Sequence, residues 1–232
     1  MIILQIYIYF NLELIKMNFV FILNGEFDKK YDLQFFQSYQ YIICVDGGYL
    51  HFQNLKLNIK PDYIIGDFDS IGNIDIKNQA QEKTKVIYKD NQDETDAEFA
   101  LKYILKEFSD KNINKIDFIY SISTSRFDHS LCNILLLKQI PININAKMLS
   151  KTQEMFLLRN KVIIEEKEGK TLSIIPITNV KGLTIKGCKW DLENTDANFG
   201  FIGGISNIIE KNRAEISLKE GECVIIITYE LK

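Results

Sequence analysis

Between Asn18 and Ile144, short apolar runs alternate with stretches of helical periodicity. The apolar runs are rich in Ile, Val, Phe and Tyr, and polar or glycine-containing loops follow them. Continuous apolar runs are typical of strands buried on both faces, and their alternation with helices favours a parallel sheet covered by helices. We therefore predict strands at residues 19–23, 41–45, 63–65, 85–88 and 116–122.

Two helices are expected within this α/β region. The first is predicted by apolar residues at helical spacing from Ala97 to Phe108, and Thr95 with Glu98 forms a capping-box pattern at its start. The second is expected over residues 128–139, because Pro141 follows directly beyond its end.

After Lys147 the pattern changes to short strands separated by Gly, Asn and charged turns. The expected strands are residues 161–164, 171–176, 183–186, 214–218 and 223–229. Gly169 and Gly221 lie in sequences that favour hairpin turns. We therefore predict an α/β domain over residues 17–147, followed by an all-β sandwich domain over residues 148–232.

Residues 1–16 are apolar but do not match a targeting segment. A signal peptide needs a positive first region and a small-residue cleavage site, and both are missing here. Asn11 and Glu13 interrupt the run before it reaches the ~20 apolar residues of a membrane-spanning helix. We interpret residues 1–16 as an N-terminal extension, either an added strand or a disordered tail, and we expect no membrane contact.

Composition excludes two classes of function. The formal net charge of -3 argues against a nucleic-acid-binding surface, which is normally basic. The four cysteines are scattered without a CxxC pair, and the chain has 2 histidines, so a Cys/His zinc site is not expected. Reduced thiols in a cytoplasmic protein are the simpler interpretation.

Aspartates follow four of the predicted strands at their carboxyl ends. They are Asp46 after the second strand, Asp67 and Asp69 after the third, Asp93 and Asp96 after the fourth, and Asp128 after the fifth. The carboxyl ends of parallel strands meet at one edge of the sheet, where open α/β folds bind their ligands. Converging carboxylates are costly unless a cation compensates their charge, and Mg²⁺ prefers a few carboxylates together with substrate phosphates. The pattern predicts a magnesium-dependent enzyme that transfers phosphoryl groups from a nucleotide.

Each of these segments also has a simpler interpretation. The DGG sequence at Asp46 is typical of an ordinary turn, and Asp93 and Asp96 are the acids that a helix N-terminus favours. Arg126 beside Asp128 could form a surface ion pair of little energetic consequence. Their joint occurrence along one predicted edge favours a functional site over coincidence.

Six segments, in this order and spacing, resemble the thiamine pyrophosphokinase (thiamine diphosphokinase) family. They are CVDGGYLHF at 44–52, PDYIIGDFDSI at 61–71, DNQDETDAEFAL at 90–101, SRFDHSLCNILLL at 125–137, GCKWDLEN at 187–194 and FGFIGGISNII at 199–209. The resemblance implies a catalytic α/β domain, a C-terminal β-sandwich and a homodimer with active sites at the subunit interface. It also implies transfer of a diphosphate group from ATP to the hydroxyl of thiamine, with release of AMP.

The resemblance also implies roles for individual residues. Asp67, Asp69 and Asp96 resemble the ligands of Mg²⁺ and the ATP phosphates, and Asp46 lies in the same acidic pocket. The residues on loops that resemble nucleotide- and substrate-binding loops are Gln92, Thr95, Arg126 and Asp128. Either Asp46 or Asp128 could accept the proton of the thiamine hydroxyl.

The thiamine-binding residues that the resemblance implies lie in the C-terminal half. Trp190 resembles the aromatic residue that packs against thiamine, with Ser206 and Asn207 nearby. Thiamine is cationic and aromatic, so an indole face and a negative pocket suit it. The alternative for the sole tryptophan is a buried core position.

The chain departs from the family pattern at Ser121–Ser125, where the family usually carries a glycine-rich stretch. Glycines let the backbone approach a phosphate closely, although Ser and Thr can still donate hydrogen bonds. Two alternatives therefore stay open. One is a pyrophosphokinase or DxD-type transferase with another acceptor, and the other is a non-catalytic protein that binds thiamine or a nucleotide.

Overall fold

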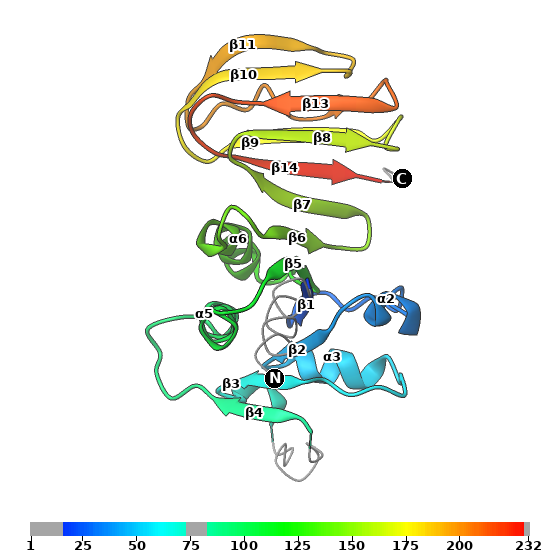
Figure 1. Ribbon diagram of the computed structural model, residues 1–232, viewed down its shortest axis with the longest axis vertical. Coiled ribbons are helices and arrows are strands. Elements are labelled where there is room, and N and C mark those ends of the chain that lie inside the picture. The colour runs from blue at the N-terminus through cyan, green and yellow to red at the C-terminus, as the bar shows by residue number, and fades with distance from the viewer. Residues whose placement is uncertain (1–15, 73–82, 230–232) are drawn as a thin grey trace, which may run out of the picture. The chain divides into compact units, whose positions relative to one another are not determined.

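The computed structural model describes residues 16–72 and 83–229, and these form two compact units that divide after Ala146 (Figure 1). The predicted N-terminal extension lies outside the described residues, apart from Lys16. Within the described ranges, no helix combines the length and the apolar character needed to cross a membrane.

The first unit contains a parallel sheet with the strand order β5-β1-β2-β3-β4, which confirms the predicted α/β fold. The strands are β1 Met17–Ile22, β2 Tyr41–Val45, β3 Tyr63–Gly66, β4 Lys85–Tyr88 and β5 Ile113–Ile119. The chain moves outward from β1 to β4 and then returns to the other side of β1. The strand order therefore reverses between β1 and β5, and such a switch point is where open α/β sheets bind ligands.

Helices cover both faces of this sheet. They are α2 Leu33–Gln37, α3 Gly48–Asn54, α5 Asp96–Glu107 and α6 Phe127–Leu136, with short 3₁₀ helices η1 Asp69–Ile71 and η2 Leu137–Gln139. The ring of Phe19 on β1 packs against Phe108 at the end of α5. Tyr39, which follows α2, bonds to Asp117 on β5, and Asp117 is paired with Val20. Because Phe19 and Val20 point to opposite faces, α5 and the α2 segment cover opposite faces.

Local chain geometry explains the early end of one predicted strand and confirms one predicted cap. Strand β5 ends at Ile119 instead of residue 122, because Tyr120 has a φ of 53° and leaves the extended conformation. Thr95 caps helix α5 as predicted, since its Oγ1 accepts a hydrogen bond from the backbone N–H of Glu98 at 3.2 Å.

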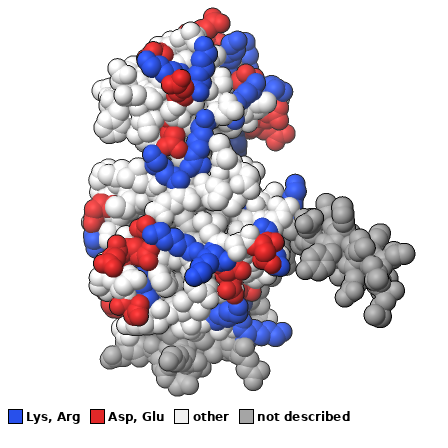
Figure 2. Space-filling model, turned by 60° about the vertical axis from the view of Figure 1, so that its left-hand side comes forward, with Lys and Arg blue, Asp and Glu red and all other residues white. Residues whose placement is uncertain are grey.

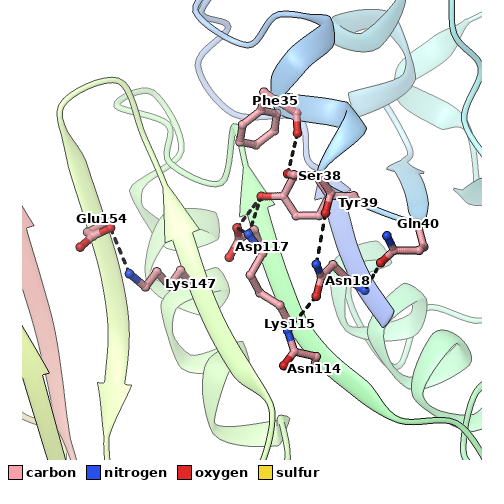
Figure 3. Close-up of polar contacts among 10 residues, drawn as sticks. All are labelled: Asn18, Phe35, Ser38, Tyr39, Gln40, Asn114, Lys115, Asp117, Lys147 and Glu154. Atoms are coloured by element: carbon pink, nitrogen blue, oxygen red, sulfur yellow. Dashed lines mark hydrogen bonds and ion pairs between the residues drawn. The ribbon is translucent and has the colours of Figure 1, made fainter. Parts of the chain in front are cut away.

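A buried polar network fixes the segment after α2 to the middle of β5 (Figure 3). Asp117 is 3% exposed, and its Oδ2 accepts hydrogen bonds from the Tyr39 hydroxyl at 2.5 Å and from Lys115 Nζ at 2.9 Å. Among the described residues, Asp117 Oδ1 has no hydrogen-bond partner. Burial, assisted by the charge of Asp117, raises the pKa of Tyr39, so its hydroxyl keeps its proton and remains a donor.

Replacing Tyr39 with phenylalanine is expected to lower the free energy of unfolding of this unit by about 1–3 kcal/mol, because it removes a donor from a buried carboxylate. Urea denaturation measures the loss. Tyr41→Phe is the control, since Tyr41 lies two residues further along the chain, at the start of β2, and is only partly buried. Equal losses in the two variants would contradict a specific role for the Asp117 contact.

The second unit is an all-β sandwich of two antiparallel sheets, as predicted. One sheet has the order β6-β7-β14-β9-β12, and the other has the order β11-β10-β13-β8. The strands are β6 Asn145–Leu149, β7 Gln153–Leu158, β8 Lys161–Glu165, β9 Thr171–Pro176, β10 Val180–Lys186, β11 Leu192–Ala197, β12 Asn207–Ile208, β13 Arg213–Ser217 and β14 Cys223–Thr228. Inward-facing residues of both sheets, such as Ile174, Ile185 and Ile225, form one buried core.

The two predicted hairpins around Gly169 and Gly221 are wrong. Strand β8 pairs with β13, whereas β9 pairs with β14, so the segment around Gly169 connects the two sheets. The segment around Gly221 connects β13 to β14 in the same way. Both glycines have positive φ, at 77° and 97°, a conformation that glycine adopts readily. Turn chemistry alone therefore does not distinguish a hairpin from a crossing between sheets.

Candidate functional site

Three of the predicted aspartates converge at the carboxyl edge of the parallel sheet. Asp46 follows β2, and Asp67 and Asp69 follow β3. One carboxylate oxygen from each lies within 4.8 Å of the other two. In the described part of the chain this is the one group of His, Cys, Asp or Glu side chains arranged to hold a metal ion, and all four cysteines are free thiols.

Two glycines allow the loops that carry these aspartates to pack closely. A Cβ on Gly48 would lie 1.9 Å from the carbonyl oxygen of Ile22, so α3 can begin this close to the end of β1 only with glycine. A Cβ on Gly66 would lie 3.0 Å from the Cβ of Asp46. These glycines therefore bring the ends of β1, β2 and β3 together.

Asp46 is the buried member of the cluster. It is 6% exposed, and its Oδ1 has no hydrogen-bond partner among the described residues. Burial raises the pKa of Asp46, and the nearby charges of Asp96 and Asp69 add to this rise, against hydrogen bonds from Ser70 and the Gly47 N–H. A buried carboxylate with an unused oxygen beside two other carboxylates fits a hard cation such as Mg²⁺.

Asp96 and Gln92 reach the same cluster from the loop after β4. Asp96 Oδ1 accepts a hydrogen bond from the backbone N–H of Asp67 at 3.3 Å, and it pairs with Lys89 Nζ at 3.2 Å. Gln92 Nε2 donates to Asp67 Oδ2 at 3.3 Å. The structure thus groups Asp96 and Gln92 with Asp67. The sequence interpretation missed Lys89, which directly follows β4.

The loops after β1 and β5 bond to each other at the switch point. The backbone N–H of Thr124 donates to Glu26 Oε1 at 3.0 Å, and the Thr124 hydroxyl donates to the same oxygen at 2.5 Å. These bonds from Thr124 lower the pKa of Glu26. Glu26 was not identified from the sequence, although it follows the first predicted strand at the same edge as the aspartates.

Hydroxyl groups also fix the loop at Ser121–Ser125, where the chain lacks the glycines of the family pattern. The backbone N–H of Ser123 donates to Ser130 Oγ at 2.8 Å, and this hydroxyl donates to the carbonyl oxygen of Ser123 at 2.9 Å. The loop is therefore fixed to the first turn of α6 through side chains. The Ser121 hydroxyl is buried without a partner among the described residues.

Arg126 and Asp128 form a two-bond ion pair, with Nε–Oδ1 at 3.1 Å and Nη2–Oδ2 at 2.9 Å. Both side chains are exposed, and Arg126 also contacts the His129 ring. The hydrogen bond from Arg126 lowers the pKa of Asp128 to about 2. Asp128 is therefore ionised at neutral pH, and it lies outside the group formed by Asp46, Asp67 and Asp69.

Trp190 lies on the surface of the second unit, so the alternative of a buried core residue is wrong. Its side chain is 56% exposed, and Lys189 Nζ lies 4.7 Å from the centre of the ring. Asn207 is buried, and its side chain accepts from the Trp190 N–H at 3.1 Å and donates to the Trp190 carbonyl at 2.8 Å. Asn207 therefore positions Trp190. Ser206 is exposed, and its backbone N–H bonds to Ser173 Oγ at 3.1 Å.

The face drawn in Figure 2 carries acidic and basic side chains next to one another. It shows no extended basic patch of the kind that a nucleic-acid surface requires. This distribution agrees with the net charge of -3.

Both units match described protein families. Residues 33–149 match the family described as "Thiamin pyrophosphokinase, catalytic domain". Residues 160–223 match the family described as "Thiamin pyrophosphokinase, vitamin B1 binding domain".

Individual proteins show the same similarity. "Thiamine pyrophosphokinase" from Bacillus subtilis (strain 168) is 29% identical over 184 residues, which are 74% of this chain and 80% of that protein. "Thiamine pyrophosphokinase 2" from Arabidopsis thaliana is 28% identical over 211 residues, or 82% and 78% of the two chains. The fold matches the solved thiamin pyrophosphokinase from Candida albicans with a TM-score of 0.76 at 21% identity, over 93% of this chain and 90% of that one.

Proposed function

Because this chain belongs to the thiamin pyrophosphokinase family, we propose that it transfers a diphosphate group from ATP to the hydroxyl of thiamine and releases AMP. The family matches cover both a catalytic domain and a vitamin B1 binding domain, as the sequence resemblance predicted. The single observation that carries the reaction is the cluster of Asp46, Asp67 and Asp69 at the ligand-binding edge of the sheet. A different acceptor or a purely binding role is not favoured.

Asp46, Asp67 and Asp69 would hold a Mg²⁺ ion, which when bound would offset the negative charge that develops on the phosphates of ATP. Asp96, which the sequence resemblance places among the metal ligands, would complete the site beside Asp67. Gln92 orients Asp67 through its hydrogen bond to Oδ2. Thr95 fixes the start of α5 and therefore the position of Asp96.

The nucleotide would extend toward the switch point between β1 and β5, where Glu26 and Thr124 fix the two loops to each other. Arg126 would contact the phosphates through its guanidinium group. In the structure this group is paired with Asp128, so phosphate binding would exchange one anionic partner for another. Both side chains are exposed, and this exchange therefore costs little.

Thiamine would stack on Trp190. The position of Lys189 above the indole shows that a cation can approach this ring. The Asn207 side chain bonds to both the backbone N–H and the backbone carbonyl of Trp190. These two bonds fix the backbone position from which the indole ring projects. Ser206 lies next to Asn207 and is exposed for contact with the ligand.

Two exposed apolar surfaces support a homodimer. On α6, Phe127, Leu131 and Leu135 recur every four residues and are all exposed. In the second unit, Phe199 and Ile202 are more than 70% exposed. A second copy of the chain would cover such surfaces, and it would place active sites where two subunits meet. A cytoplasmic location is supported by the four free thiols.

The test is an assay of the purified chain with thiamine, ATP and MgCl₂. We expect AMP and thiamine diphosphate to form in equal amounts and both to require magnesium and thiamine. Pterin and sugar acceptors serve as controls for another acceptor. Release of ADP instead of AMP would overturn the proposed reaction, and thiamine binding by calorimetry without turnover would support the non-catalytic alternative.

A further inference from the structure

Lys89 is a buried cation beside the acidic cluster. It directly follows β4, and its side chain is 3% exposed. Lysine is almost never fully buried unless it is paired. Its backbone N–H donates to the carbonyl oxygen of Gly66 at 2.9 Å, so the residue is fixed against the end of β3, directly before Asp67.

The ammonium group of Lys89 makes two contacts. It lies 3.2 Å from Asp96 Oδ1 and donates to the carbonyl oxygen of Glu94 at 2.9 Å. The same Asp96 oxygen accepts the backbone N–H of Asp67. One atom of Asp96 therefore joins Lys89 to the loop that carries two of the clustered carboxylates.

The negative charges of the cluster explain how a charged lysine can be buried there. Asp46, Asp67 and Asp69 lie together, and Asp96 adjoins them. Carboxylates this close together repel one another unless a cation lies near them. Breaking a buried ion pair by removing one partner leaves the other charge uncompensated.

We propose that Lys89 is a positioning residue that serves as an internal counter-cation. It keeps Asp96 and the carboxylate cluster in place when no metal is bound. Its positive charge also offsets part of the negative charge that would otherwise attract a metal ion. This inference rests on the proposed metal site. It predicts that Lys89, through Asp96, and a divalent metal both offset the negative charge of this group of carboxylates.

The test compares the thermal stability of wild type and Lys89→Met, first in EDTA and then with MgCl₂. Methionine keeps the length and removes the charge. In EDTA we expect the Tm of the variant to fall by roughly 5–10 °C. Magnesium should restore at least half of this loss while raising the Tm of wild type much less. Manganese should also bind the variant about tenfold more tightly in calorimetry, because a like charge has been removed.

Two further variants separate this role from simple packing. Lys85→Met is the control, since Lys85 begins β4, the strand that Lys89 directly follows, and it pairs with Glu107 at 2.9 Å, outside the cluster. It should not change the response to magnesium. Lys89→Met combined with Asp96→Asn should recover stability in EDTA, because the carboxylate that Lys89 pairs with then carries no charge either.

Three outcomes would overturn the proposal. These are an equal loss of Tm with and without magnesium, weaker manganese binding by Lys89→Met, and failure of both the single and the double variant to fold in either condition. None of these measurements uses thiamine or turnover. A chain that fails the thiamine assay can therefore still pass this test, and the reverse also holds.

Discussion

Asp69→Asn is expected to lower the rate of magnesium-dependent AMP release by at least about 100-fold. Asparagine keeps the size of the side chain but removes one of the charges in the cluster. Asp69 is exposed at the rim, and its Oδ1 accepts a hydrogen bond from the Ser70 hydroxyl at 3.1 Å, which an amide oxygen can also do. The fold should therefore persist while the metal site is lost. Initial rates measured over a range of magnesium concentrations show the effect.

Asp93→Asn is the matched control for this variant. Asp93 is an exposed aspartate on the loop after β4, and it lies outside the group of Asp46, Asp67 and Asp69. Its replacement should leave AMP release close to that of wild type. If Asp69→Asn retained wild-type turnover, or if both variants lost activity equally, the assignment of Asp69 to the metal site would be wrong.

The sheet and the acidic cluster were predictable because both depend on short-range pattern. Continuous apolar runs mark buried parallel strands, and the carboxyl ends of such strands share one edge. Asp46, Asp67 and Asp69 could be expected to meet there without knowledge of their contacts. The position of Asp96 was likewise indicated by the cap at Thr95, since a capped helix start fixes the residue that follows.

Contacts between distant segments could not be predicted. Glu26 bonds to Thr124, which lies 98 residues further along the chain, and nothing near either residue indicates this pairing. Lys89 has the local sequence of an exposed lysine at the end of a strand. Its burial depends on the packing of the loop that ends at Asp96 against the end of β3. The crossings at Gly169 and Gly221 were missed for the same reason, because sheet membership is decided by remote strands.

Trp190→Ala should raise the KM for thiamine by about tenfold or more, with a much smaller change in kcat. The exposed indole offers a π face to a cationic aromatic ring, and alanine removes both stacking and the cation–π attraction. An interaction made equally in the ground state and the transition state changes KM and leaves kcat nearly unchanged. Steady-state kinetics with varied thiamine at saturating ATP measures this, and the KM for ATP should not change.

Two substitutions test whether the aromatic face itself is responsible. Trp190→Phe keeps a π face and the backbone bonds to Asn207, so its KM should lie between those of wild type and Trp190→Ala. Lys189→Met removes the cation that lies 4.7 Å from the ring centre, and it should leave the KM for thiamine unchanged or lower it. An unchanged KM in Trp190→Ala would mean that thiamine does not stack on this residue. A parallel rise in the KM for ATP would instead indicate general damage to the protein, because the indole is proposed to contact thiamine alone.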